Sequence, residues 1–277
     1  MRLSTYDRPR VIACAEDHPN HIGLPRGCID EITEALQGLG IRPTVRDERQ
    51  AGQRLEMAFQ GELRHEQQQA ADALLKHDTG VLAATTAFGK TVVSAWLIAK
   101  RGASTLVLVH RRQLLDQWVE RLSTFLGVPA KSIGRIGGGR HTATGLLDVA
   151  VIQSLVKKNV VDDRVAEYGQ LIVDECHHLS AHSFEQVARQ AKARFVLGLS
   201  ATVARKDGHH PIIFMQCGLI RHRVSARAQA ASRPFEHFAL VHPTSFHPAR
   251  APHADKRVEF QTLYQELVEH DARNLEA

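Results

Sequence analysis

Five short apolar runs, each followed by a segment with helical spacing, constrain the fold of this chain more than any other feature. None of the runs alternates apolar and polar residues, as a strand with one solvent-exposed face would. Continuous apolar runs suit strands that are covered on both faces, and crossover helices join such strands in parallel. The pattern predicts an α/β domain with a mainly parallel sheet. The runs are residues 81–84, 105–109, 148–152, 171–173 and 195–199.

The chain before residue 60 has a different pattern. Apolar residues recur at helical spacing between residues 29 and 39, and Gly40 follows as a helix stop. Short apolar runs at residues 11–15 and 41–45 flank this helix and predict strands. We therefore expect a small α+β accessory domain at residues 1–60, the α/β domain at residues 61–225, and a linker with a terminal amphipathic helix at residues 226–277.

Charge and cysteine content narrow the possible partners and the compartment. The sequence has 35 Lys and Arg against 30 Asp and Glu, a formal net charge of +5, which favours a polyanionic partner. None of the four cysteines belongs to a C-x-x-C pair, so neither a disulfide framework nor a cysteine-rich zinc module is predicted. No signal-peptide core and no run of membrane-span length is present in the sequence. We expect a cytoplasmic protein without a membrane partner.

A phosphate-binding loop is predicted directly after the first apolar run. A loop between a strand and a helix directs backbone N–H groups at phosphate, while Lys90 would reach the terminal phosphates and the Thr91 hydroxyl would bind Mg²⁺. The sequence departs from G-x-x-x-x-G-K-T because Ala84 replaces the first glycine, and Ala87 stands where another glycine is common. The predicted ATP-binding residues of the loop are Ala84, Thr85, Thr86, Ala87, Phe88, Gly89, Lys90 and Thr91.

A second pattern typical of phosphate chemistry lies at the fourth run, where residues 171–177 read Leu-Ile-Val-Asp-Glu-Cys-His. At the end of a parallel strand, Asp174 can hold the magnesium shell, and its neighbour Glu175 can orient or deprotonate the attacking water. Each pattern alone has a plain alternative, a chance Gly-Lys-Thr turn or a solvated strand end. Their occurrence together and in this order predicts a site for ATP and Mg²⁺, with Lys90, Asp174 and Glu175 as catalytic residues.

Further short strings accompany these two patterns. Residues 63–67 read Leu-Arg-His-Glu-Gln, 109–114 Val-His-Arg-Arg-Gln-Leu, 137–140 Gly-Gly-Gly-Arg and 199–202 Leu-Ser-Ala-Thr. The set resembles superfamily 2 helicases of the DEAD/DEAH-box type, in particular XPB-like helicases and type III restriction-enzyme motor subunits. The resemblance covers roughly residues 60–225. It implies a RecA-like P-loop domain, the first motor domain of an ATP-dependent DNA helicase or translocase.

The resemblance also implies roles for particular residues. Arg64 and Gln67 would read the adenine, although His65 and Glu66 replace the family's usual Pro-Tyr. Basic side chains at a helix start and glycines that permit close approach suit contacts with a nucleic-acid backbone, although a basic turn can also be merely solvated. The implied nucleic-acid contacts are Arg111, Arg112, Gly137, Gly138, Gln153 and Ser154. The residues implied to couple ATP to nucleic acid are His177, Ser200, Ala201 and Thr202.

The family's second motor domain carries a Q-x-x-G-R-x-x-R element whose arginines complete the ATP site, and these 277 residues contain no such string. We therefore expect a truncated chain that is weakly active alone, with a second RecA-like domain as its partner. Three alternatives remain open: an ATP-gated nucleic-acid-binding module without independent turnover, an RNA helicase, and a P-loop ATPase unrelated to nucleic acid. In the N-terminal unit, which faintly resembles the small domain that precedes the motor in XPB-like proteins, Arg26, Arg42 and Arg46 are candidate contacts for DNA or a partner, unless the unit is a packing appendage.

Overall fold

The structure is a computed structural model that describes residues 15–158, 160–177, 181–201, 210–224, 246 and 260–270. By their contacts, residues 1–232 form one compact unit and residues 233–277 another. The predicted domain boundaries at residues 60 and 225 stay predictions. None of the helices in the described ranges is long and apolar enough to cross a membrane.

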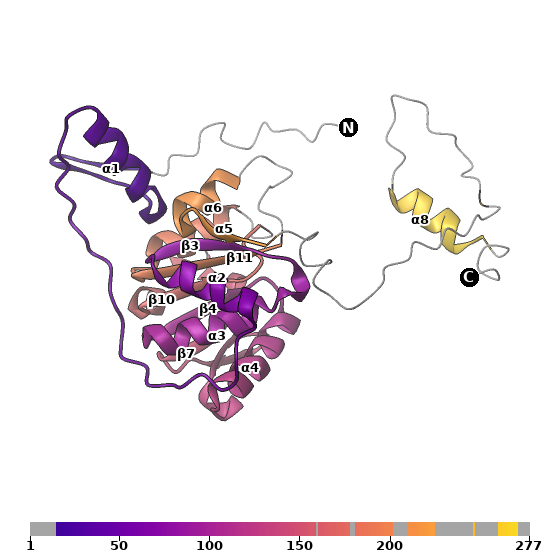
Figure 1. Cartoon of the computed structure of the whole chain (residues 1–277). Helices are drawn as coiled ribbons and strands as arrows, with labels where there is room; N and C mark the ends of the chain where they lie inside the picture. The colour runs from indigo at the N-terminus through magenta and orange to yellow at the C-terminus, as the bar shows by residue number, and fades with distance from the viewer. Residues whose placement is uncertain are drawn as a thin grey trace. The chain divides into compact units, whose positions relative to one another are not determined.

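An eight-stranded sheet forms the centre of the first unit (Figure 1). Its strand order is β12-β3-β11-β10-β4-β7-β5-β6, and each neighbouring pair is parallel except β5 with β6. All five predicted runs form strands of this sheet, which confirms the mainly parallel α/β fold. The strands are β3 (Thr79–Ala83), β4 (Thr105–Val109), β5 (Gly134–Gly137), β6 (Arg140–Thr142), β7 (Leu147–Val151), β10 (Gln170–Val173), β11 (Phe195–Ser200) and β12 (Ile220–Arg223).

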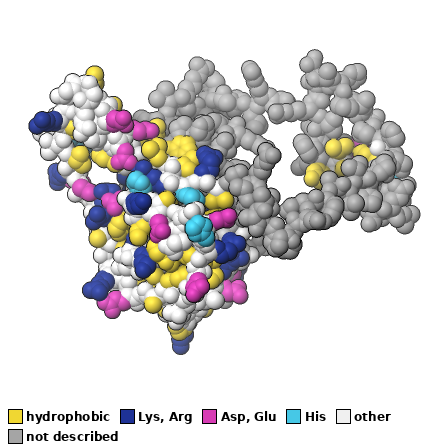
Figure 2. All heavy atoms as spheres, in the orientation of Figure 1, with side chains coloured by type: hydrophobic (Ala, Val, Ile, Leu, Met, Phe, Trp, Pro, Cys, Tyr) yellow, Lys and Arg dark blue, Asp and Glu magenta, His cyan; other side chains and the backbone are white. Residues whose placement is uncertain are grey.

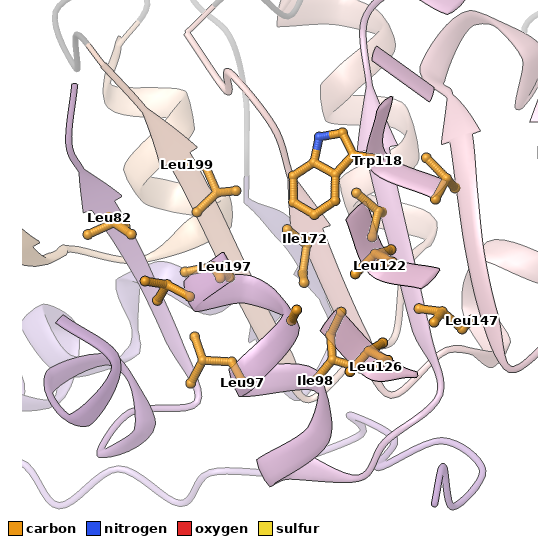
Figure 3. Close-up of a cluster of buried hydrophobic side chains, with 14 of the residues drawn as sticks. Leu82, Leu97, Ile98, Trp118, Leu122, Leu126, Leu147, Ile172, Leu197 and Leu199 are labelled. Atoms are coloured by element: carbon orange, nitrogen blue, oxygen red, sulfur yellow. The ribbon is translucent and has the colours of Figure 1, made fainter. Parts of the chain in front are cut away.

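Helices cover both faces of the sheet (Figure 1). Successive side chains of a strand point to opposite faces, so each buried strand contributes to two cores. Leu82 and Ile172 pack with α2, α3 and α4, whereas their neighbours Val81 and Val173 pack with α5 and α6. Figure 3 shows part of the first core. The helices are α2 (His65–Leu75), α3 (Lys90–Arg101), α4 (Arg112–Leu126), α5 (Ala181–Gln190) and α6 (His210–Cys217).

Short 3-10 turns and one short strand pair lie in the loops that connect the main strands and helices. A small antiparallel pair, β8 with β9, follows the 3-10 turn η4. The turn η2 lies inside the predicted phosphate loop. These elements are η2 (Thr86–Phe88), η3 (Ala130–Ser132), η4 (Ile152–Ser154), β8 (Val156–Lys157), β9 (Val160–Val161) and η5 (Asp163–Glu167).

The N-terminal segment contains the hairpin β1 (Glu16–His18) and β2 (His21–Gly23), the turn η1 (Arg26–Cys28) and helix α1 (Ile29–Gly38). The helix confirms the predicted apolar spacing. The strand predicted at residues 41–45 is wrong, because residues 41–49 have no regular structure. An apolar run becomes a strand only where a neighbouring strand pairs its backbone groups, and this run has none in the described chain. Of the strand predicted at residues 11–15, residues 11–14 lie outside the described residues.

After α1 the chain crosses to the main sheet as an extended segment, residues 41–55, which we call the strap (Figure 1). Gln50 bridges to Ala193, and Arg54 bridges to Ala103. Leu55 is only 5% exposed and belongs to the core beside α2, α3 and α4. The strap therefore fastens the N-terminal segment to the sheet through backbone pairing and one buried side chain.

Arg26 does not take the predicted role of a DNA contact. Its guanidinium donates to the carbonyl oxygens of Ala193 and Ala188, at 2.9 Å each, and also to that of Ala191. Burial lowers the pKa of Arg26. Backbone carbonyls at the end of α5 thus use the donors that phosphate would need, so this prediction is wrong. Arg42 and Arg46 are exposed, and their role as DNA contacts stays a prediction.

The second unit is described only at residue 246 and at residues 260–270. It contains the predicted terminal helix, α8 (Phe260–Val268). Tyr264 and Val268 are 64% and 70% exposed, whereas Leu263 and Leu267 are half-buried. The predicted helix is therefore present, but Tyr264 and Val268, two of the apolar residues that suggested an amphipathic helix, are exposed, so its amphipathic role stays a prediction.

Candidate nucleotide and nucleic-acid site

The predicted phosphate loop joins β3 to α3 at the carboxyl edge of the sheet. The Ala84 N–H donates to the Ser200 carbonyl at 2.9 Å, which places the loop beside the end of β11. Gly89 has a φ of +91°, a conformation that L side chains rarely adopt. A Cβ atom on residue 89 would also lie 2.5 Å from the Gln67 Nε2 atom. Both constraints require glycine immediately before the first turn of α3, where backbone N–H groups favour anions.

Lys90 connects this loop to the acidic strand end. Its side chain is only 7% exposed, and its Nζ donates to the Ala84 carbonyl at 3.2 Å and to the Glu175 Oε1 at 3.0 Å. A buried ammonium group needs such partners because the loss of water is costly. The ion pair joins two patterns that lie 85 residues apart in the sequence. Thr91 follows in the first turn of α3 and is half-buried.

Asp174 lies at the end of β10 and is 7% exposed. Its backbone N–H donates to the Leu108 carbonyl at 2.9 Å, and its Oδ2 accepts from the Trp118 Nε1 at 2.7 Å. Burial raises the pKa of Asp174, the charge of Glu175 adds to this, and the indole N–H of Trp118 opposes it. Glu175 has a φ of +45°, and non-glycine residues in this left-handed region are concentrated at functional sites.

His177 and Ser200 extend the same polar cluster. The His177 Nδ1 lies 3.3 Å from the Glu175 Oε2 and 2.8 Å from the Ser200 hydroxyl. A continuous line of contacts therefore runs from Lys90 through Glu175 and His177 to the end of β11. Ala201 follows as an exposed residue, and Thr202 lies outside the described residues.

The two residues predicted to read adenine contact the backbone of the phosphate loop. The Gln67 Nε2 donates to the Phe88 carbonyl at 2.8 Å, and an Arg64 NH2 donates to the same oxygen at 2.7 Å. The Gln67 Oε1 accepts from the Arg64 backbone N–H at 3.0 Å. These contacts place the start of α2 against the loop. The role of Arg64 and Gln67 in adenine binding stays a prediction.

The predicted nucleic-acid contacts come from three segments that follow β4, β5 and β7 and pack against one another. Arg111 and Arg112 are exposed at the start of α4. A Cβ atom on Gly138 would lie 2.6 Å from the Arg112 Cδ, and one on Gly137 would lie 3.0 Å from the Ser154 Oγ. The loop after β5 therefore packs against α4 on one side and η4 on the other. Gln153 is exposed on the same turn, η4.

The charges on the visible face are mixed. Figure 2 shows Lys and Arg side chains interspersed with Asp and Glu over the described part of the molecule, without a continuous basic stripe on that face. The described residues also include ion pairs between basic and acidic side chains, such as Arg135 with Asp116 at 2.8 Å. The net charge of +5 alone therefore does not locate a nucleic-acid surface; the three segments around Arg112, Gly138 and Ser154 indicate one.

Trp118 is the site residue that the sequence motifs missed. Its spacing with Leu115, Val119 and Leu122 places it on the buried face of an amphipathic helix, and it is 3% exposed. A buried indole also needs an acceptor for its N–H. That requirement, applied to a tryptophan on a helix beside the carboxyl edge, would have indicated an acidic partner, but it does not identify Asp174.

The comparisons with known proteins agree with this geometry. The family model described as "Type III restriction enzyme, res subunit" matches residues 60–205, more than half of the chain. The chain is 33% identical over 171 residues to the putative ATP-dependent RNA helicase L396 of Acanthamoeba polyphaga mimivirus, which covers 60% of this chain and 33% of that protein. It is 30% identical over 169 residues to the DNA 3'-5' translocase XPB2 of Sulfurisphaera tokodaii, with 61% and 37% covered.

A solved structure shows the same fold. The UvsW helicase from bacteriophage T4 matches 73% of this chain and 80% of that chain, with a TM-score of 0.58 and 19% identity. The chain spans about a third of the length of the curated relatives named above. The family match covers the phosphate loop, the acidic strand end and the start of α4. The chain therefore belongs to the type III restriction enzyme res subunit family, as the first RecA-like domain of a superfamily 2 protein.

Proposed function

We propose that this chain is the ATP-binding module of an ATP-dependent DNA helicase or translocase, which couples hydrolysis of Mg-ATP to movement along DNA or its unwinding. The observation that carries the proposal is the buried contact between the Lys90 Nζ and the Glu175 Oε1 at 3.0 Å. This contact unites the two patterns that phosphoryl transfer needs. The curated relatives are named as a DNA translocase and as a putative RNA helicase.

The residues at this edge fit ATP and Mg²⁺. Gly89 gives the loop its left-handed turn before α3, where any side chain would collide with Gln67. The Lys90 ammonium would hold the terminal phosphates, and Thr91 and Asp174 would hold the magnesium shell. Bound Mg-ATP supplies the bond that is broken and a cation that shields its charge. Glu175 would then orient the attacking water and accept its proton, which is the role of a general base.

The segment around Arg112 supports nucleic acid as the partner. Exposed Arg111 and Arg112 at a helix start, with the Gly138 backbone packed against Arg112, form a surface suited to phosphate oxygens. Such contacts go to the backbone, so we propose binding without base-sequence specificity. The contacts of Glu175 with His177 and of His177 with Ser200 link the catalytic acid to the end of β11, and they are the proposed means of coupling.

A second RecA-like domain is the proposed partner for full activity. In this class of motors, arginines from another domain stabilise charge in the transition state, and such residues contribute about 10³-fold to 10⁵-fold in phosphoryl transfer. We therefore propose that residues 1–277 bind Mg-ATP but hydrolyse it slowly by themselves. A cytoplasmic location is proposed with this function.

Phosphate release in the presence of duplex DNA, single-stranded DNA or RNA tests the proposal. We expect a slow rate that duplex DNA increases, and we expect the Lys90→Ala variant to lose it. Stimulation by RNA alone would favour the RNA helicase. Binding of Mg-ATP and DNA without turnover would favour the ATP-gated module. Nucleotide binding with no affinity for any of the three nucleic acids would contradict the proposal and favour an unrelated P-loop ATPase.

A further inference from the structure

The indole of Trp118 has one hydrogen-bond donor, and that donor is committed to Asp174. The Nε1 to Oδ2 distance is 2.7 Å, and the two side chains are 3% and 7% exposed. In Figure 3 the ring lies at the margin of the apolar cluster near Ile172, and its nitrogen is turned out of that cluster. Packing therefore fixes the ring, and the ring in turn fixes one oxygen of the carboxylate.

Because Trp118 lies on α4, its hydrogen bond also connects the start of that helix to Asp174. Helix α4 begins at Arg112, one of the proposed nucleic-acid contacts, and Trp118 follows roughly two turns later. The helix is packed against the core through buried Leu115, which lies between Arg112 and Trp118, and through buried Val119 and Leu122, which follow Trp118. A rigid element of this kind is a continuous physical route from the start of α4 to the indole, and from the indole to the Asp174 carboxylate.

We propose that Trp118 is a positioning residue that transmits the state of the nucleic-acid contact at the start of α4 to the magnesium ligand Asp174. The inference rests on the proposed function, because it assigns Asp174 to magnesium and Arg112 to nucleic acid. By linkage, the effect runs both ways: Mg-nucleotide held at Asp174 changes the affinity of α4 for nucleic acid, and nucleic acid changes the affinity for Mg-nucleotide by the same factor. Trp118 acts through Asp174 and does not touch the reacting atoms.

Simple packing is the competing explanation for a large buried ring, and two variants separate it from positioning. Trp118→Phe keeps an aromatic ring in the core but removes the N–H donor. Val119→Ala is the matched control, because Val119 is the next residue on α4, is fully buried, and carries no polar group. We expect both variants to lower the free energy of unfolding, whereas only Trp118→Phe removes the hydrogen bond that orients the Asp174 carboxylate.

The first measurement is equilibrium binding of a fluorescent ATP analogue over a range of Mg²⁺ concentrations. Loss of a hydrogen bond that orients a metal ligand costs about 10-fold to 100-fold in metal affinity. We expect Trp118→Phe to raise the required Mg²⁺ concentration by about tenfold. We expect Val119→Ala to leave it at the wild-type value. An unchanged Mg²⁺ requirement in Trp118→Phe, or an equal change in both variants, would overturn the proposal.

The second measurement uses the fluorescence emission of Trp118 itself, so the hydrogen bond between Trp118 and Asp174 is left intact. The sequence has two tryptophans, so Trp96→Phe leaves Trp118 as the only one. We expect its emission to change when Mg-nucleotide binds and to change again when duplex DNA is added. Constant emission while both ligands are bound would refute the coupling, even if Trp118→Phe failed to fold. If wild-type protein bound neither Mg-nucleotide nor DNA, the proposed function would fail first, and the inference with it.

Discussion

Two regions at the carboxyl edge of the sheet differ in how deeply their side chains are buried. We call the region around Lys90, Asp174 and Glu175 the ATP edge, and the region around Arg111, Arg112 and Gln153 the nucleic-acid edge. Lys90 and Asp174 are each 7% exposed, and hydrogen bonds hold both. Arg111, Arg112 and Gln153 are exposed. The contrast follows from the two tasks. Phosphoryl transfer needs charges that are already oriented in a site of low polarity, whereas a backbone contact with nucleic acid needs charge that water and salt can reach.

The difference predicts how each edge responds to mutation. At the ATP edge, side chains serve both the fold and the chemistry, so substitutions there affect stability and activity together. At the nucleic-acid edge, the exposed arginines contribute little to the fold, so their loss affects binding alone. Glycines give the sharpest test, because Gly89 and Gly138 both adopt positive φ but have different neighbours.

Lys90→Ala has the largest expected effect. The variant removes the cation proposed for the terminal phosphates, together with its ion pair to Glu175. We expect nucleic-acid-stimulated phosphate release to fall by about 10²-fold to 10³-fold. Lys100→Ala, on the exposed face of the same helix, is the control and should retain the wild-type rate. Retention of more than half the activity in Lys90→Ala would remove Lys90 from the proposed site.

Gly89→Ala should lower the free energy of unfolding more than Gly138→Ala. Alanine in a left-handed conformation costs about 1–2 kcal/mol. At Gly89 the new Cβ would also displace buried Gln67 and its bonds to Phe88, which adds about 1–3 kcal/mol. At Gly138 the new Cβ meets only the flexible end of Arg112. Urea unfolding should therefore show a larger loss for Gly89→Ala than for Gly138→Ala, and equal losses would contradict the comparison.

Arg111→Ala with Arg112→Ala should have the smallest effect on the fold and a specific effect on binding. We expect the free energy of unfolding to change by less than about 0.5 kcal/mol. Each phosphate contact contributes about 0.9 to the slope of log affinity against log salt, so the slope should decrease by about 2. Fluorescence anisotropy with labelled duplex DNA at several salt concentrations measures this slope. Wild-type affinity and slope in the double variant would exclude these arginines as contacts.

The sequence predicted the parts of this fold that depend on local pattern. Continuous apolar runs located the strands, and loop chemistry located Lys90 and Glu175, because each motif is contained in a few neighbouring residues. The strand expected at residues 41–45 failed, since an apolar run cannot show whether a partner strand is available. The contacts of Arg26 with the carbonyls of Ala188, Ala191 and Ala193 could not be predicted either, because the turn η1 and the end of α5 are brought together only by tertiary packing.

The contact between Trp118 and Asp174 shows the same limit within the candidate site. The strand-end motif identified Asp174 as a functional residue, whereas Trp118 belongs to no motif and its helical spacing indicates only a buried position. Their pairing across 56 residues depends on how α4 packs against the sheet, which no local pattern contains. Side chains that link a functional motif to the core are therefore the ones that sequence motifs overlook.

We propose that ligand binding at the ATP edge changes the affinity of the nucleic-acid edge for DNA. A linkage measurement tests this coupling most directly. The affinity of residues 1–277 for duplex DNA is measured by anisotropy without nucleotide and with a slowly hydrolysed Mg-ATP analogue. We predict a change of about 5-fold to 150-fold, the usual range of coupling between two sites, and its loss in Lys90→Ala. Identical DNA affinities in the two conditions, although each ligand binds by itself, would contradict the account.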